Sequence, residues 1–166
     1  MASLDSLQDL YLDQLRDLYS AESQIADALP KMAETASHPE LRQAFETHLA
    51  QTREHAQRIE RICDGLGESP RGETCDGMKG LLKEGEKTMK ARADSDVLDA
   101  ALIAAAQRVE HYEIAAYGCT KTYARLLGRD QDVRLLQQTE DEEGQTDQLL
   151  TRLAERAINL DAAARR

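Results

Sequence analysis

Two glutamates interrupt an alanine-rich segment that otherwise has the composition of a buried helix. The segment AAAQRVEHYEIAAYG, residues 104–118, places Glu110 and Glu113 one turn apart on the same helix face. Carboxylates that are buried together raise one another's pKa and lose their hydration, so they need a compensating partner. The pair therefore predicts either a bound cation or a hydrogen-bonded polar network at this point of the fold.

The other three long helices that we predict also become polar near their middles. Apolar residues at helical spacing flank each interruption on both sides, as in an amphipathic helix that faces a core. The polar seam positions of these helices are Glu22; His48, Thr52 and His55; and Glu140, Glu143 and Asp147. We expect the four interruptions to meet in one layer, with apolar packing on both sides of it.

A pair of divalent cations is the simplest compensation for such a layer. Hard and borderline cations bind carboxylate oxygens and imidazole nitrogens, and two ions can share a bridging carboxylate. Bundles with two iron or two manganese ions use one Glu from each of two helices and a Glu-x-x-His from each of the other two. This chain provides the first half of that pattern and approximates the second.

Each residue also has an ordinary explanation when it is taken alone. Glu22 and Glu113 could be seam-edge side chains that reach solvent, and His48 and His55 could be hydrogen-bonded core histidines. The acidic run at 140–143 is typical of a solvated helix face. The metal interpretation depends on the coincidence of all four interruptions.

The elements that must position these residues form an all-α, ferritin-like four-helix bundle. Short turns make the first two and the last two helices antiparallel hairpins, and a long connection can return the third helix parallel to the second. Ser37 and Glu40 form a predicted capping box at the start of the second helix. We expect one domain over 1–166, with helices at about 4–35, 39–64, 96–127 and 130–160, a crossover at about 66–95 that contains a short helix, and a frayed tail at about 161–166.

Composition limits the partners of the chain. The 166 residues are 41% hydrophobic and 31% charged, and their net charge of −10 includes no basic stripe, so we expect no nucleic-acid partner. No apolar run approaches the length of a membrane span, and the first residues lack the regions of a signal peptide. The three cysteines have irregular spacing and no zinc motif, which favours reduced thiols in a cytoplasmic protein.

The two predicted hairpins also resemble each other. Tyr19-x-x-Glu22 aligns with Glu110-x-x-Glu113, and Gln51-x-x-x-His55 aligns with Glu143-x-x-x-Asp147. A pseudo-two-fold repeat of this kind would place the paired positions around one centre.

Four segments resemble the YciE/YciF family of bacterial ferritin-like stress proteins. They are DLYSAESQIADALPKMA, LRQAFETHLAQT, DAALIAAAQRVEHYEIAAYG and TEDEEGQTDQLLTRLA, and the resemblance runs from about Leu7 to Ala154. The resemblance implies a rubrerythrin-like bundle with an extra short helix, a homodimer, and a site of the di-iron type.

The resemblance also implies a set of metal ligands. Gln51 stands where the family has a glutamate on the second helix, and an amide cannot bridge two ions as a carboxylate does; His55 is the available substitute. A dinuclear, an asymmetric and a mononuclear site therefore all stay open. The ligands that we predict are Glu22, His48, His55, Glu110, Glu113, Glu143 and Asp147.

Two classes of function follow. The first is a redox metalloprotein with two iron ions per chain, or manganese or zinc in their place, and O2 or peroxide as oxidant; ferroxidase, peroxidase-type and dimanganese catalase-like reactions are all compatible. The second is a metal-free structural or interaction bundle in which the polar layer is a hydrogen-bonded network. Mineral storage would require a shell, which the sequence does not indicate. No catalytic residue is assigned.

Overall fold

The computed structural model describes residues 4–165, and this part of the chain is helical without a β-strand. Its elements are α1 (Leu7–Thr35), α2 (Pro39–Leu66), α3 (Asp76–Met89), α4 (Ser95–Leu126), α5 (Asp130–Leu153), a π-helical turn (Ala154–Ile158) and α6 (Asn159–Ala164). The predicted all-α fold is confirmed. Residues 1–3 and 166 of the expected domain and tail lie outside the described residues. None of the helices in the described part is both long enough and apolar enough to cross a membrane.

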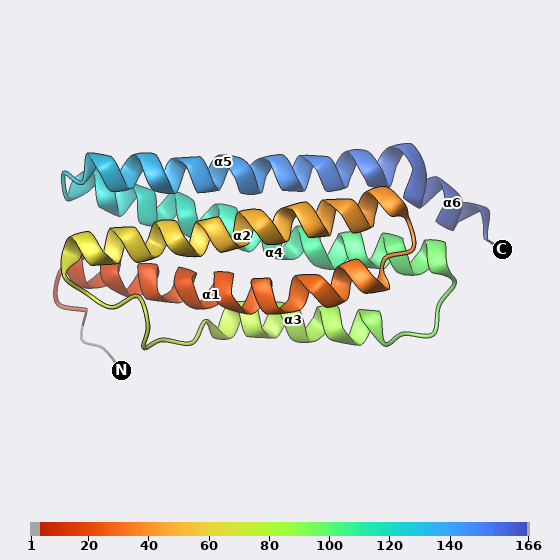
Figure 1. The fold of residues 1–166 in the computed structure, drawn as a ribbon, viewed down its shortest axis with the longest axis horizontal. Coiled ribbons are helices and arrows are strands. Elements are labelled where there is room, and N and C mark those ends of the chain that lie inside the picture. Colours follow the sequence, from red (N-terminus) through yellow and green to blue (C-terminus); the bar gives the residue numbers. More distant parts are fainter. Residues whose placement is uncertain (1–3, 166) are drawn as a thin grey trace.

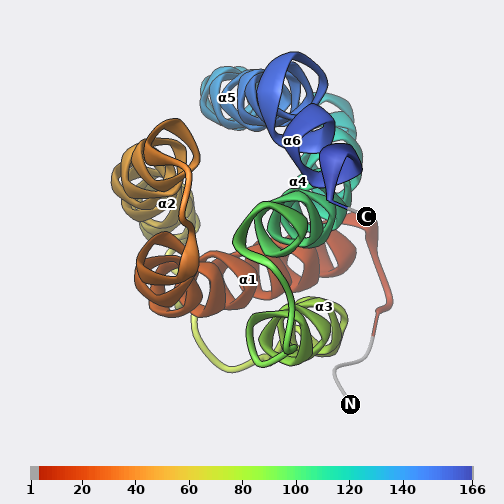
Figure 2. The ribbon, with the colours of Figure 1, turned by 90° about the vertical axis from the view of Figure 1, so that its right-hand side faces the viewer.

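The helices form two antiparallel hairpins that one long crossover connects (Figure 1). α1 pairs with α2, α4 pairs with α5, and the crossover carries α3 along the bundle so that α4 runs parallel to α2. Seen along the bundle, α1, α2, α5 and α4 surround a common interior, and α3 lies outside beside α1 and α4 (Figure 2). This is the predicted ferritin-like topology.

The start of α2 differs from the predicted capping box. Its N-cap is His38, which makes no side-chain capping bond, and Pro39 is the first helical residue. The carboxylate of Asp99 on α4 accepts hydrogen bonds from the backbone amides of Ser37 (2.9 Å) and His38 (2.7 Å). A carboxylate from another helix thus satisfies amides before α2, and the prediction that Ser37 and Glu40 cap it is wrong.

The two chain ends also differ from the predicted bounds. The hydroxyl of Ser6 accepts a hydrogen bond from the Asp9 amide at 3.1 Å, so α1 begins after Ser6 and not near residue 4. The last predicted helix is interrupted by the π-helical turn and then continues to Ala164. Arg165 follows it and lies 2.6 Å from the Asp96 carboxylate at the start of α4.

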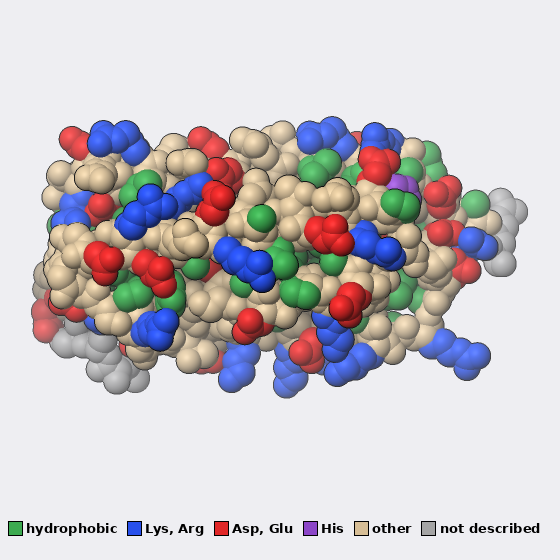
Figure 3. Space-filling view, in the orientation of Figure 1, with side chains coloured by type: hydrophobic (Ala, Val, Ile, Leu, Met, Phe, Trp, Pro, Cys, Tyr) green, Lys and Arg blue, Asp and Glu red, His purple; other side chains and the backbone are tan. Residues whose placement is uncertain are grey.

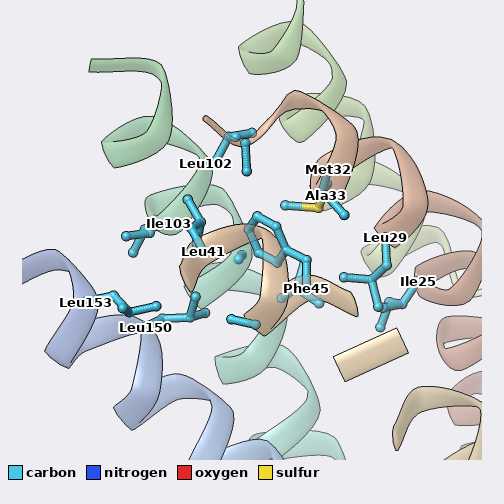
Figure 4. Packing of buried hydrophobic residues seen from close by; sticks show 14 of the residues in the cluster. Ile25, Leu29, Met32, Ala33, Leu41, Phe45, Leu102, Ile103, Leu150 and Leu153 are labelled. Atoms are coloured by element: carbon cyan, nitrogen blue, oxygen red, sulfur yellow. The ribbon is translucent and has the colours of Figure 1, made fainter. Parts of the chain in front are cut away.

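Two apolar clusters fill the interior at opposite ends of the bundle. The first apolar cluster, shown in Figure 4, joins all the long helices and includes Ile25, Leu29, Met32, Ala33, Leu41, Phe45, Leu102, Ile103, Leu150 and Leu153. The second apolar cluster includes Tyr11, Leu15, Leu18, Ile59, Ile62, Cys63, Tyr117, Ala124 and Leu136. The helix segments between the two clusters carry buried polar side chains, among them Glu22, His55, Glu113 and Glu143.

α3 covers one edge of the bundle. It packs against α1 and α4, and its buried residues are Met78 and Gly85. Lys and Arg side chains gather along the lower edge of the molecule in Figure 3, where α3 lies. Three of its fourteen residues, Gly77, Gly80 and Gly85, are glycines, each of which disfavours a helix by about 1 kcal/mol relative to alanine. The glycines therefore weaken the intrinsic preference of α3 to stay helical.

Candidate metal centre

The four long helices bring six of the seven predicted ligands into one buried layer between the apolar clusters. α1 contributes one carboxylate, α2 two imidazoles, α4 two carboxylates and α5 one carboxylate. Every one of these side chains is at most 2% exposed: Glu22, His48, His55, Glu110, Glu113 and Glu143. The predicted polar layer is thus present, and all four helices contribute to it.

The layer contains two groups of potential ligand atoms that share one residue. In the first group, one ligand atom from each of four side chains lies within 4.8 Å of the others: His48, Glu110, Glu113 and Glu143. In the second group the same holds for Glu22, His55 and Glu143. Glu143 belongs to both groups, so either group that held a metal ion would use this side chain.

The imidazole nitrogens face carboxylates at short distances. His48 Nε2 lies 3.4 Å from Glu110 Oε1 and 3.6 Å from Glu143 Oε2. His55 Nδ1 lies 3.4 Å from Glu22 Oε1 and 2.8 Å from Glu143 Oε1, at an angle that makes no hydrogen bond. Each ring thus directs one nitrogen toward the middle of the layer.

Many atoms of the layer are buried without a hydrogen-bond partner. They are one oxygen each of Glu22 and Glu110, both oxygens of Glu113 and of Glu143, His48 Nε2 and His55 Nδ1. Buried polar atoms in folded proteins are nearly always hydrogen-bonded, so a cluster of exceptions requires an explanation. Carboxylate oxygens and imidazole nitrogens that converge without hydrogen-bond partners fit a divalent cation.

Glu142 and Arg58, a pair of charged side chains, hold Nε2 of His55, the ring nitrogen that points away from the layer. This nitrogen lies 2.8 Å from Glu142 Oε2, and Arg58 donates to both oxygens of Glu142 at 2.7 and 3.1 Å. Burial opposes ionisation of Glu142, but hydrogen bonds from Arg58 and His55 lower its pKa to about 2. An ionised carboxylate only accepts hydrogen bonds, so His55 donates Nε2–H to it and keeps Nδ1 for the layer.

The outer nitrogen of His48 is held by a threonine. The Thr146 hydroxyl lies 3.1 Å from the backbone carbonyl of Glu142, to which it donates, and 3.3 Å from His48 Nδ1. With its only hydrogen donated, this hydroxyl accepts from His48 Nδ1–H, which leaves Nε2 as a lone pair inside the layer. On the opposite side, the Tyr117 hydroxyl donates a short hydrogen bond to Glu22.

Burial and like charges shift the ionisation of the layer. Burial, together with the neighbouring carboxylates, raises the pKa values of Glu110 and Glu113 well above the ordinary value of 4.5. Burial opposes protonation of His55, but Glu143 and Glu22 outweigh it and raise its pKa to about 10. The metal-free layer therefore holds protons that a cation would displace.

Asp147 does not join this layer. Its Oδ1 accepts a hydrogen bond from Gln107 Nε2 at 3.0 Å and lies 3.3 Å from Nε2 of the exposed His111, at the outer edge of α4. Glu140, which we placed on the same seam, pairs instead with Lys121 of α4.

The buried stripe of α5 runs along the other flank of the helix. Its members include Leu136, Thr139, Glu143, Thr146 and Leu150. Thr139 accepts a hydrogen bond from Arg58 of α2, and Thr146 contacts His48. α5 thus turns its threonine side toward α2, and the predicted seam through Glu140 and Asp147 is wrong at these two positions.

The structure also changes the interpretation of Gln51, because Thr52 and not Gln51 is the fully buried residue. Gln51 is half-buried in a groove between α2 and α5. The buried pairs are therefore Thr52-x-x-His55 on α2 and Glu143-x-x-Thr146 on α5, so the proposed alignment of Gln51 with Glu143 is wrong by one residue. Relative to two Glu-x-x-His motifs, α2 keeps only the histidine and α5 keeps only the glutamate.

Comparison with known proteins identifies the family. The family model described as "Domain of unknown function (DUF892)" matches residues 6–163. The chain belongs to the DUF892 family. A similar protein is Protein YciF of Escherichia coli (strain K12), which is 39% identical over 161 residues, or 96% of this DUF892 chain and 97% of YciF. The predicted resemblance is thereby confirmed.

Solved structures share the fold of this DUF892 chain. The crystal structure of the E. coli stress protein YciF has a TM-score of 0.90 and 40% identity, covering 93% of this chain and 98% of YciF. YcfI from Rhodopseudomonas palustris, described as a candidate structural protein, has a TM-score of 0.86 and 42% identity, with coverage of 91% and 98%. A protein from Xanthomonas campestris pv. campestris (TM-score 0.77, 20% identity, coverage 96% and 98%) shows the fold alone.

Sequence reasoning missed the side chains that hold the two histidines. Glu142 belongs to an acidic run that is typical of a solvent face, and threonines such as Thr146 carry little signal in a polarity pattern. Arg58 did carry a signal, because it lies three residues after His55 and thus on the same face of α2 of this DUF892 chain. An arginine in that position indicates a buried acceptor, here Glu142.

Proposed function

We propose that this DUF892 protein is a metal-binding stress protein with a dinuclear iron centre in its polar layer. The observation that carries the proposal is the set of buried carboxylate oxygens and imidazole nitrogens that lack hydrogen-bond partners and converge in two groups sharing Glu143. The relative YciF is described as a stress protein, which supports the broader assignment. Manganese and zinc suit the same nitrogen and oxygen donors, so the geometry favours a class of cation and iron is the member that we propose.

Each ligand group would hold one ion. His48, Glu110 and Glu113 would bind the first, Glu22 and His55 the second, and Glu143 would bridge them. When all four carboxylates of the layer are ionised they carry a formal charge of −4, which two divalent cations neutralise. This balance explains why a layer with four buried glutamates is compatible with a folded bundle.

Two Fe(II) ions supply two electrons, enough to reduce one O2 to H2O2 or one H2O2 to two water molecules when two protons are added. The layer and the residues around it would support this chemistry in three ways. The two apolar clusters exclude bulk water from both sides. Tyr117 orients Glu22, and Glu142 and Thr146 fix the two imidazoles. Glu110 and Glu113 hold protons until a cation displaces them.

The test is the number of iron ions per chain after anaerobic loading with Fe(II) and desalting, measured by elemental analysis. We expect about two in the unchanged protein. Glu22→Gln removes a member of the second group only and Glu110→Gln a member of the first only, so each should leave about one. Glu143→Gln removes the shared residue and should lower both. Glu46→Gln, an exposed position on α2, is the matched control and should leave about two.

Absence of iron from the unchanged, folded protein would overturn the proposal. An iron content in the three layer variants equal to that in the control would show adventitious surface binding and would overturn it too. Circular dichroism and cooperative thermal unfolding establish that each variant is folded.

A second candidate function is a structural or interaction bundle without metal. Its support is the description of the relative YcfI and the close pairing of His55 with Glu22 and Glu143. In that case the protonated His55 is the partner of the carboxylates, and Fe(II) neither binds nor changes the melting temperature. The same elemental analysis therefore distinguishes the two functions.

A further inference from the structure

A surface groove lies between α1, α3 and α4. Its volume is about 590 Å³, and its lining includes Met32 on α1, Leu82 on α3 and Val109 on α4. Met32 and Val109 are each 7% exposed, so these otherwise buried side chains form the floor of the groove. The groove thus opens onto the apolar interior of the bundle.

A smaller cavity continues from this floor toward the polar layer. Its volume is about 20 Å³, and it shares Ala28, Met32, Leu82 and Val109 with the groove. At its inner end lie His48 and Glu110 of the first ligand group. The remaining lining residues are apolar except for Thr146. An apolar route therefore leads from the surface under α3 to the side of the layer where His48 and Glu110 face each other.

The size and polarity of the inner cavity select its occupant. A space of this volume holds one molecule about as large as water. A molecule with hydroxyl groups, such as H2O2, would give up hydrogen bonds to water on the apolar walls, at a cost of about 2–7 kcal/mol for each unpaired group. Dioxygen makes no such bonds and loses nothing by leaving water for this space.

We propose that this route admits dioxygen, and that O2 rather than H2O2 is the oxidant delivered to the layer. The role of O2 as oxidant rests on the proposed metal function, whereas the route itself does not. Ala28 is the position at which to block the route, because it is a small, half-buried residue that lines both the groove and the inner cavity.

The route is tested in metal-free protein by methyl NMR under O2 pressure, where dissolved O2 speeds the relaxation of nearby methyl groups. The methyl groups of Met32, Leu82 and Val109 should relax at least threefold faster than those of Leu15 and Leu136 in the second apolar cluster. Ala28→Leu should abolish this difference. Ala26→Leu, a half-buried position on α1 that lines neither space, should leave it unchanged. Ala28→Val provides a smaller insertion if the leucine variant does not fold.

Equal relaxation of both sets of methyl groups would overturn the route, whether or not the protein binds iron. Persistence of the difference in folded Ala28→Leu and Ala28→Val would overturn it as well. Faster relaxation in a protein that binds no iron would support the route while the metal function fails.

The choice of oxidant is tested in iron-loaded protein. Ala28→Leu should slow oxidation of bound Fe(II) by O2 at least fivefold and leave oxidation by H2O2 within twofold of the unchanged protein. Equal slowing with both oxidants, or slowing with neither, would overturn the assignment of O2.

Discussion

At the scale of single residues, Glu142 is informative because its position in the sequence conceals its role. It lies in an acidic run, yet it connects Arg58 to the outer nitrogen of His55. Partners of this kind fix the tautomer of a ligating histidine and contribute to metal affinity without touching the ion.

Replacing Glu142 with glutamine should therefore weaken the second ion selectively. We expect about a 10- to 100-fold loss of affinity at the His55 group and little change at the His48 group, because only His55 depends on Glu142 for its orientation. Competition with a chelator of known affinity measures both constants. Asp141→Asn, an exposed neighbour, is the control, and equal affinities in Glu142→Gln and the unchanged protein would contradict the assigned role.

A second residue-scale prediction concerns the pH dependence of stability in metal-free protein. Burial and the adjacent carboxylates raise the pKa of Glu113 in the folded state well above 4.5. The stability that this group contributes is fully present below pH 4.5 and is lost as the pH rises through the raised pKa. Glu113→Gln removes this dependence. The free energy of unfolding of the variant should therefore increase, relative to that of the unchanged protein, as the pH rises.

Chemical denaturation between pH 5 and pH 8 measures this difference. We expect the free energy of unfolding of Glu113→Gln to exceed that of the unchanged protein by about 1–3 kcal/mol near pH 8, and by less near pH 5. Glu46→Gln should show no such trend, since its carboxylate is exposed. A difference that shrinks with rising pH would contradict the prediction, because Glu113 would then be ionised and stabilised in the fold.

At the scale of elements, the glycines of α3 allow a paired experiment. A methyl group added at Gly80 meets open space, whereas one added at Gly77 would lie 2.8 Å from the ring of Tyr112. Both positions are helical, so an alanine should gain helix propensity in each case, and only Gly77→Ala should also create a clash.

Gly80→Ala should therefore stabilise α3 by about 0.5–1 kcal/mol, and Gly77→Ala should destabilise it. Amide hydrogen exchange of α3 measures both changes directly. Gly144→Ala on α5 also meets open space, and as a control it should leave exchange in α3 unchanged. Faster exchange of α3 in Gly80→Ala would contradict the prediction, because the added methyl group meets open space and only helix propensity should change.

Helices, hairpins and the crossover were predictable from the sequence because chain length and apolar periodicity determine them. The rotation of α5 about its own axis, which decides which of its side chains face the interior, was not predictable. Glu140 and Thr139 lie on neighbouring flanks of one helix, and the polarity pattern does not favour the threonine. Contacts of Arg58 and His48 with Thr139 and Thr146 set that rotation, and such contacts exist only in the assembled bundle. The same limit applies to Asp99, whose partners lie some sixty residues earlier in the chain.

Of the candidate site, the members that lie at the centre of a seam were predictable. Glu22, His55, Glu110 and Glu113 sit at the midpoint of a regular apolar pattern, and all four are buried. Asp147 sits on a flank, where one residue of helix rotation changes a buried position into an exposed one. Gln51 was misleading for the same reason, since Thr52 beside it occupies the layer.

At the scale of the whole molecule, the proposed cations connect two apolar clusters that otherwise meet across a layer of like charges. An ion that binds only the folded chain stabilises it by about 2.7 kcal/mol when its free concentration is 100 times the Kd. We therefore expect Fe(II) or Zn(II) to raise the melting temperature by several degrees, and EDTA to reverse the change. Glu143→Gln should show almost no shift, and an equal shift in that variant would place the stabilising ion elsewhere.

The division of the ligands between the hairpins has a consequence for how the molecule could be taken apart. Glu22, His48 and His55 come from the α1–α2 hairpin, and Glu110, Glu113 and Glu143 come from the α4–α5 hairpin. Neither hairpin holds a complete ligand group. A chain cut in the crossover would form two fragments whose association depends on the concentration of free cation, because each ion that binds across the junction adds its binding energy to the joined form. The bundle is thus the single-chain equivalent of a metal-dependent heterodimer.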